Sequence, residues 1–147
     1  MHESPEHRFN SEYPDIAACA CDTCRSACRR PGWPTPTEAL DLLAAGLGDR
    51  LMRDYWCLPD GGEMPILSPA ERGREGGGAS FMRDGRCTFH TFDGRCELHE
   101  TGLKPAECRK SGCSRAEGSA DIHKAIAVLW DSAEGRAVFE LWRTRSY

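Results

Sequence analysis

The sequence predicts a small, mainly α-helical single domain, in which bound metal staples an irregular cysteine-rich region that carries a short β-hairpin. Three observations lead to this fold class. Leucines recur at helical spacing after residue 36, apolar residues do so again after residue 119, and all nine cysteines lie between positions 19 and 113. A chain of 147 residues has room for one domain with a modest core. We therefore expect a flexible N-terminal tail over residues 1–18 and a single cysteine-cluster metal-binding domain over residues 19–147.

The first helix is expected from about Thr37 to Tyr55. Thr35 followed by Glu38 has the spacing of a capping box, and Thr37 is a rival N-cap. Residues 1–18, by contrast, are polar and show no apolar period, which is why a flexible tail is expected there. The stripe that should face the core recurs at spacings of three and four: Leu40, Leu43, Leu47 and Leu51.

The stretch from Leu58 to Gly85 is rich in glycine and proline and is expected to be loop. The next stretch, GRCTFHTFDGRCELHE, alternates briefly and has a turn signal at Asp93-Gly94, which predicts a short hairpin carrying Cys87 and Cys96. Two further helices should follow, each packing on the first, at about residues 120–130 and 133–143, with Ser132 as the cap between them.

The segment from Leu58 to Ser119 has few large apolar side chains and many glycines. Ordering its backbone costs roughly 1 to 2 kcal/mol per residue, which burial in such a segment is not expected to repay. Metal ligation can contribute on the order of 10 kcal/mol in small domains. We therefore expect metal to hold this segment in place.

Composition narrows the classes of function. No apolar run approaches the roughly 18 residues of a membrane span, and the N-terminal residues lack a secretory pattern, so a cytoplasmic protein without membrane contact is expected. In that reducing compartment nine cysteines indicate metal or redox chemistry more than disulfides. The net charge of -4 argues against a nucleic-acid partner, although it is compatible with a local basic patch.

The spacing of the cysteines indicates a thiolate metal site. Cys21, Cys24 and Cys28 form a tight triad that lacks a fourth ligand, which must come from farther along the chain. Three close cysteines and a remote one favour an iron–sulfur cluster over Zn²⁺. Cys57 follows an apolar stretch alone and is interpreted as a small buried hydrophobe. The remaining candidate ligands are Cys19, Cys87, Cys96, Cys108 and Cys113.

Basic residues next to the cysteines could stabilise thiolates and tune a bound metal. Arg109 is the main candidate and Arg29 the second; Arg25, Arg30 and Lys110 are otherwise solvated charges. His90 and His99 each follow a cysteine by three residues, a spacing that zinc knuckles use. With many thiols present, a surface or hydrogen-bonding role is favoured for both histidines.

These motifs resemble the YkgJ-type cysteine-cluster family, described as a zinc- or iron-chelating domain, over roughly residues 19 to 113. The resemblance rests on CDTCRSAC, GRCTF and GRCELHETGLKPAECR. It implies that the ligands include the triad with Cys87, Cys96 and Cys108, beside Glu100, Pro105 and Arg109. The family's paired cysteines are replaced by the lone Cys28, so that Cys19 or Cys113 would supply the missing thiol, and His99 stands where an aromatic residue is usual.

The best hypothesis is a cysteine-thiolate metal-binding protein with a structural or metal-handling role. One alternative is an iron–sulfur-dependent redox or group-transfer enzyme or accessory protein, because larger proteins similar to this family are flagellin lysine methylases. Another is a zinc-stapled module that binds protein or nucleic acid. The sequence contains neither a nucleotide fingerprint nor a Ser/His/Asp arrangement, so no catalytic residue is assigned.

Overall fold

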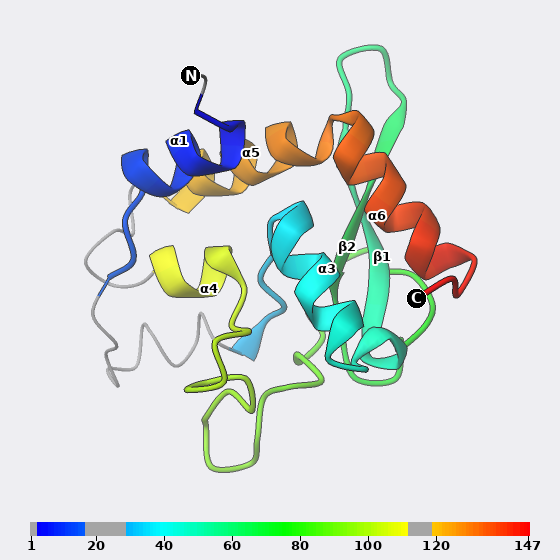
Figure 1. The fold of residues 1–147 in the computed structure, drawn as a ribbon. Helices are drawn as coiled ribbons and strands as arrows, with labels where there is room; N and C mark the ends of the chain where they lie inside the picture. Colours follow the sequence, from blue (N-terminus) through cyan, green and yellow to red (C-terminus); the bar gives the residue numbers. More distant parts are fainter. Residues whose placement is uncertain (1–2, 17–28, 112–118) are drawn as a thin grey trace.

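The computed structural model describes residues 3–16, 29–111 and 119–147 (Figure 1). In these ranges a two-stranded sheet packs with five α-helices. The strands are β1 (Leu51–Cys57) and β2 (Glu63–Pro69), and a 3-10 turn (Gly48–Arg50) precedes them. The helices are α1 (Pro5–Glu12), α3 (Pro36–Ala44), α4 (Ala106–Lys110), α5 (Ser119–Trp130) and α6 (Ala133–Arg143).

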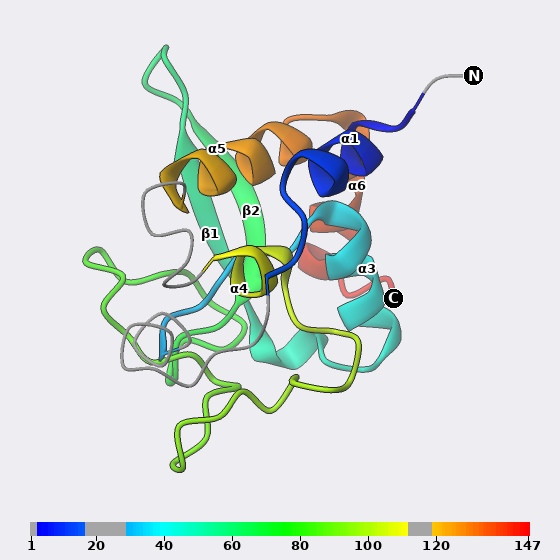
Figure 2. The same cartoon turned by 90° about the vertical axis from the view of Figure 1, so that its left-hand side faces the viewer.

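The antiparallel hairpin of β1 and β2 is at the centre of the core. Leu51 pairs with Pro69 and Cys57 with Glu63, so the register is continuous along both strands. The turn closes where the Leu58 N–H donates to the Gly62 carbonyl at 2.8 Å, next to Gly61 at φ +87°. Helices α3, α5 and α6 all contact β2, and Figure 2 shows α5 crossing the hairpin. The core therefore forms between this small sheet and its helices.

The prediction of a helix from Thr37 to Tyr55 is wrong beyond Ala44, where α3 ends. Its chain leaves the helix at Gly46, which has a φ of +81°, and residues 51–57 become β1. The buried face of α3 is also shifted, because Leu42 is fully buried whereas Leu40 is 42% exposed. Pairing with a distant strand overrides the local helical period here.

The hairpin is therefore not where the sequence placed it. The residues around Asp93-Gly94 form a turn with a single antiparallel bridge, between His90 and Cys96. The true hairpin lies within residues 51–69, which were expected to be helix and loop. The residues of β2, EMPILSP, contain two prolines, which obscured the strand signal.

A metal-stapled fold is also wrong for the part of the chain that the structure describes. Residues 3–16, 29–111 and 119–147 contain no group of three or more His, Cys, Asp or Glu side chains that could hold a metal ion. Instead, buried side chains hold the segment after Leu58. The Glu71 carboxylate accepts hydrogen bonds from the backbone N–H groups of Ser80 and Gly85 and from the Ser80 hydroxyl. The apolar residues buried there are Met64, Ile66, Leu67, Phe89 and Leu98.

The N-terminal residues contain a helix where a flexible tail was expected. Ser4 caps α1 by accepting from the His7 N–H, and Phe9 is the residue that α1 buries. The Phe9 ring lies 5.4 Å from the Lys110 ammonium and packs beside Tyr13. One buried aromatic residue in a polar helix has no period that the sequence could reveal.

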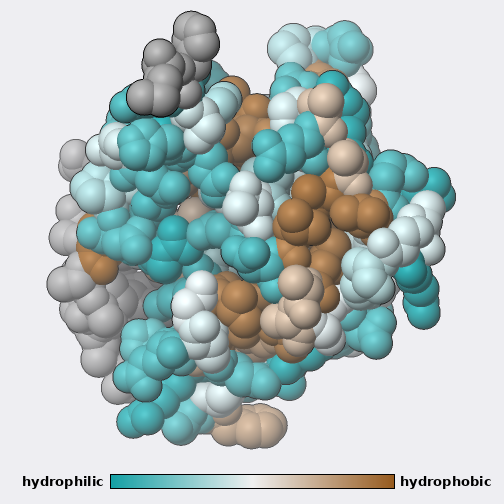
Figure 3. All heavy atoms as spheres, in the orientation of Figure 1, coloured by the Kyte–Doolittle hydropathy of each residue, from teal (hydrophilic) through white to brown (hydrophobic). Residues whose placement is uncertain are grey.

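Other predicted elements are confirmed. Thr35 and Glu38 form the predicted capping box of α3, and Ser132 caps α6. Helices α5 and α6 match the two predicted C-terminal helices. In the view of Figure 3, hydrophobic residues form patches over α3 and α6, and hydrophilic residues cover most of the remaining surface. No helix in the described ranges is long and apolar enough to cross a membrane.

Candidate functional site

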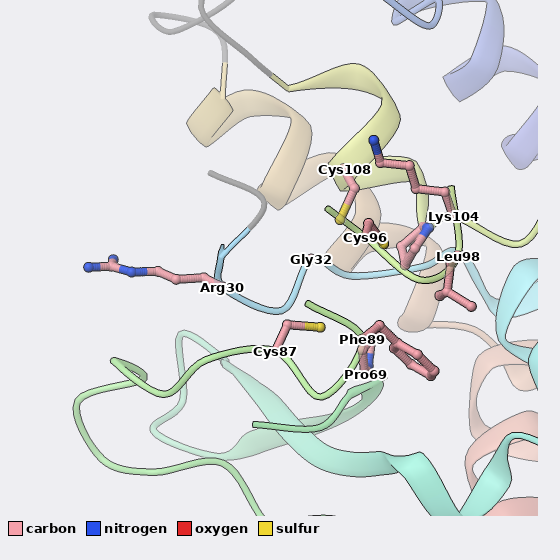
Figure 4. A pocket seen from close by; sticks show the side chains of 10 residues that line it. Arg30, Gly32, Pro69, Cys87, Phe89, Cys96, Leu98, Lys104 and Cys108 are labelled. Carbon is pink, nitrogen blue, oxygen red and sulfur yellow. The ribbon is translucent and has the colours of Figure 1, made fainter. Parts of the chain in front are cut away.

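Three predicted ligands from separate segments line one pocket (Figure 4). Cys87 and Cys96 come from the loops between β2 and α4, and Cys108 comes from α4. Their sulfurs approach from different sides, with Cys87 opposite the other two. Most of the remaining wall is apolar, and the lining is completed by Arg30, Gly32, Pro69, Phe89, Leu98, Lys104 and Pro105.

The three pocket cysteines make at most part of a ligand set. In the described ranges they do not form a group that could hold a metal ion by themselves. The predicted triad Cys21, Cys24 and Cys28 lies outside the described residues, as do Cys19 and Cys113. The structure thus brings together three of the eight predicted ligands, and the other five lie outside the described residues.

Both ends of the segment that carries the triad are attached beside this pocket. On the N-terminal side the Ile16 N–H donates to the Arg109 carbonyl at 3.1 Å, one residue from Cys108. On the C-terminal side the Cys87 N–H donates to the Arg29 carbonyl at 2.8 Å. Ile16 and Arg29, the described residues that border positions 17–28 in the sequence, are therefore both bonded next to or at a pocket cysteine.

Gly32 brings the chain closest to a pocket cysteine. A Cβ atom at Gly32 would lie less than 3.0 Å from Cys108 Sγ, a separation that real side chains do not show. The next residue, Trp33, donates its N–H to Glu107 Oε1 at 2.8 Å, and the Glu107 N–H donates to the Trp33 carbonyl at 3.2 Å. This reciprocal pair holds the segment after the triad against α4.

The environment of Cys87 favours its neutral form. Burial raises the pKa of the Cys87 thiol to about 11, and the charge of Cys96 acts in the same direction. A hydrogen bond from the Phe89 backbone and the positive charges of Arg50 and Arg72 oppose this rise. Ionisation of Cys87 therefore requires additional positive charge at the pocket, which a bound cation would supply.

Arg50 and Arg72 are site residues that the sequence did not indicate. Arg50 precedes β1 and Arg72 follows β2, outside every cysteine motif, and the antiparallel pairing brings both to the open end of the hairpin, near Cys87. Arg50 also forms an ion pair with Glu97 at 2.7 Å and lies 4.2 Å from the Phe89 ring centroid. Only the register of β1 and β2 could have revealed them.

The predicted basic candidates are placed differently. The Arg109 guanidinium pairs with Asp15 at 3.0 Å and with Glu38, and these carboxylates raise its pKa although burial acts to lower it. The buried Lys110 ammonium pairs with Asp15 at 2.9 Å. Both cations attach the N-terminal segment to α4. The Arg29 side chain is exposed, and Arg30 extends away from the pocket in Figure 4.

A second polar cluster includes Glu107 of α4. His123 Nδ1 is 2.6 Å from Glu107 Oε2, and its ring stacks on Trp33 at 3.7 Å between centroids. The ring of Trp56 packs edge-on against His123 at 5.6 Å. No motif in the sequence marks His123, because its partners come from three separate segments.

The other residues that the sequence singled out differ in burial. His90 is buried and its Nδ1 accepts from Arg86 Nε at 2.8 Å, whereas His99 is exposed. Cys57 is exposed at the end of β1 and is not the buried hydrophobe that was expected. Pro105 precedes α4 and lines the pocket, and Glu100 is exposed.

No family model matches the chain, and neither the curated proteins nor the solved structures gave a significant match. The resemblance to the YkgJ-type family therefore rests on the cysteine motifs alone.

Proposed function

We propose that this chain is a cysteine-thiolate metal-binding protein of the YkgJ type, acting in a reducing cytoplasm. Its ligand set would combine the triad Cys21, Cys24 and Cys28 with the pocket cysteines Cys87, Cys96 and Cys108. Cys19 or Cys113 would complete a polynuclear or second centre.

One observation carries the proposal. Ile16 and Arg29, which border the triad segment in the sequence, are hydrogen-bonded to Arg109 and to Cys87, so both lie near the pocket that three further cysteines line. A triad lacks its fourth donor, and the pocket offers donors next to both anchors.

The pocket also has the chemistry that a thiolate centre needs. Its lining is mostly apolar, and Arg50 and Arg72 supply positive charge near Cys87, where several thiolates would leave a net negative centre. The spacing of the triad favours an iron–sulfur cluster over Zn²⁺ as the bound group. The described core is held by packed apolar side chains, so the fold does not need a metal to stabilise it. The proposed role of the metal is therefore metal handling or redox chemistry.

Anaerobic purification followed by analysis for iron, zinc and acid-labile sulfide tests the proposal. Iron with equal sulfide and absorbance near 400 nm would support a cluster, and zinc alone would support a zinc site. Protein that contains neither metal, and that fails to take up either in reconstitution, would contradict it.

Two serine variants locate the site. Cys108→Ser should lose most of the bound metal, because its sulfur lies in the pocket beside Gly32. Cys57→Ser is the matched control and should keep the wild-type metal content, since Cys57 is exposed at the end of β1. Equal metal content in both variants would rule out the pocket as the site.

A further inference from the structure

A phenylalanine at the tip of a tight turn is almost fully exposed. This residue, Phe92, is 95% exposed. The turn beneath it is fixed, because the Thr91 N–H donates to the Arg95 carbonyl at 2.8 Å and Gly94 adopts a φ of +82°. The ring is therefore held out from the surface with at least one face open.

Two guanidinium groups flank this ring. Arg86 lies 5.1 Å and Arg72 lies 6.0 Å from the Phe92 ring centroid. Arg86 donates to His90 Nδ1 and to the Thr91 carbonyl, and Arg72 donates to the His90 carbonyl. These bonds hold both cations beside the ring, and none of the three is to a carboxylate.

Neither arginine has a carboxylate partner among residues 3–16, 29–111 and 119–147. Other arginines of the same region do: Arg83 pairs with Asp54 at 2.9 Å, and Arg50 pairs with Glu97. Arginines outnumber acidic residues five to three over residues 72–95, although the whole chain has a net charge of -4. The turn thus presents local positive charge that the overall composition conceals.

We propose that Phe92, Arg72 and Arg86 form a binding site for single-stranded nucleic acid, in which a base stacks on Phe92 and adjacent phosphates contact the two guanidinium groups. An exposed aromatic ring between cations is the combination that binds unpaired strands without sequence preference. A protruding ring needs only an open face to stack a base, whereas an acidic peptide is usually bound in a groove or along a sheet edge. Phe92 and Arg86 are not among the residues that line the cysteine pocket, whereas Arg72 is shared, because its charge also acts on Cys87. The proposal does not depend on the proposed metal function.

Fluorescence anisotropy with labelled oligothymidylate and oligouridylate of about twelve nucleotides tests this site, because one module covers roughly 4 to 16 nucleotides. Phe92→Ala should weaken binding by about fivefold or more, whereas Phe92→Trp should retain it. Arg72→Gln should lower the slope of log affinity against log salt by about 0.7, the value for one phosphate contact on a single strand.

Phe81→Ala is the matched control. Phe81 is also exposed, at 88%, but the neighbouring cation Arg83, two residues away, is paired with Asp54. Loss of the Phe81 ring should therefore leave the affinity for the oligonucleotides unchanged. Circular dichroism of each variant verifies that it is folded, and Phe92→Trp keeps the test decisive if the alanine variant does not fold.

Three outcomes would overturn the proposal: no binding of either oligonucleotide at about 50 mM salt, equal loss of affinity in Phe81→Ala and Phe92→Ala, or binding of a polyglutamate peptide in preference to the oligonucleotides. The last would indicate an acidic protein partner. All binding measurements use chelated protein, so failure here would leave the proposed metal function standing.

Discussion

At the residue scale, the pocket depends on the absence of a side chain at Gly32. The backbone of Gly32 lies against Cys108 Sγ and against the Cys108 N–H, so the segment after the triad can approach α4 closely only without a Cβ atom. The conformation of Gly32 does not itself require glycine, because its φ lies outside the left-handed region. Close approach to a sulfur is therefore the reason for glycine at this position.

Gly32→Ala should reduce metal binding without removing a cysteine. The added methyl group would displace Cys108 Sγ or the 29–33 segment, at a cost of about 1 to 3 kcal/mol in the free energy of unfolding. Gly77→Ala is the control, because a Cβ there meets only the Arg74 carbonyl oxygen at 3.4 Å. Urea denaturation and metal analysis of both variants check this; equal metal content would contradict the packing argument.

Cys87 should make stability of the metal-free protein fall at alkaline pH. Burial raises its pKa from 9.0 to about 11, so between these pH values the unfolded thiol loses its proton while the folded one keeps it. The unfolded state then binds fewer protons, and the free energy of unfolding decreases as pH rises, by up to roughly 2 kcal/mol.

The measurement is urea denaturation from pH 8 to pH 10.5 after chelation. Cys87→Ala should show a flatter decline than wild type, although it is less stable near neutral pH. Cys57→Ala, which alters an exposed cysteine, should follow the wild-type curve. Parallel curves for wild type and Cys87→Ala would show that Cys87 does not titrate as expected.

At the scale of elements, α3 positions α4 through the cap at its N-terminus. Glu38 Oε1 accepts from the N–H of Thr35 and from the N–H of Ala106 at the start of α4. Its second oxygen pairs with Arg109. One capping glutamate thus satisfies the ends of two helices and fixes the helix that carries Cys108.

Thr35→Ala should destabilise the protein by about 1 to 2 kcal/mol, because its hydroxyl accepts from the Glu38 N–H and also bonds to Glu6 on α1. Thr37→Ala should cost less than about 0.5 kcal/mol, since Thr37 is exposed and bonds only to Glu134 at 3.3 Å. Thermal denaturation of the two variants compares the rival caps directly. A larger effect at Thr37 would reject Thr35 as the cap.

At the scale of the whole molecule, the core is continuous from the hairpin to the cysteine pocket. Cys87, Phe89 and Leu98 belong to the same buried cluster as Leu51, Ile66 and the apolar faces of α3, α5 and α6. Trp130 joins the helices to the segment after the triad, since its Nε1 donates to the Pro34 carbonyl at 2.8 Å. The walls of the pocket are therefore part of the general core.

Removal of metal should leave this core folded. Side-chain packing and the hydrogen bonds to Glu71 hold residues 63–98, and the helices pack on one another without metal ligands. Chelation should therefore change the far-ultraviolet circular dichroism signal by less than about a tenth. Limited proteolysis of the chelated protein should not produce new cuts within residues 63–71 or 87–98. Rapid cleavage in either range after chelation would show that metal holds them after all.

Local rules determined the features that depend on neighbouring residues. The capping box at Thr35 and Glu38, the Ser132 cap and the two C-terminal helices follow from spacing and hydrogen-bonding chemistry within a few residues. The sequence also included Cys87, Cys96 and Cys108 among eight candidate ligands, and the structure places these three at one pocket.

The tertiary structure alone decided the features that depend on distant partners. Residues 51–57 form a strand because residues 63–69 pair with them, although their leucine continues a helical period. Arg50 and Arg72 approach Cys87, and Arg72 and Arg86 flank Phe92, through chain contacts that no motif encodes. Long-range pairing and burial set these positions, and a single sequence records local preferences without recording which distant segments will satisfy them.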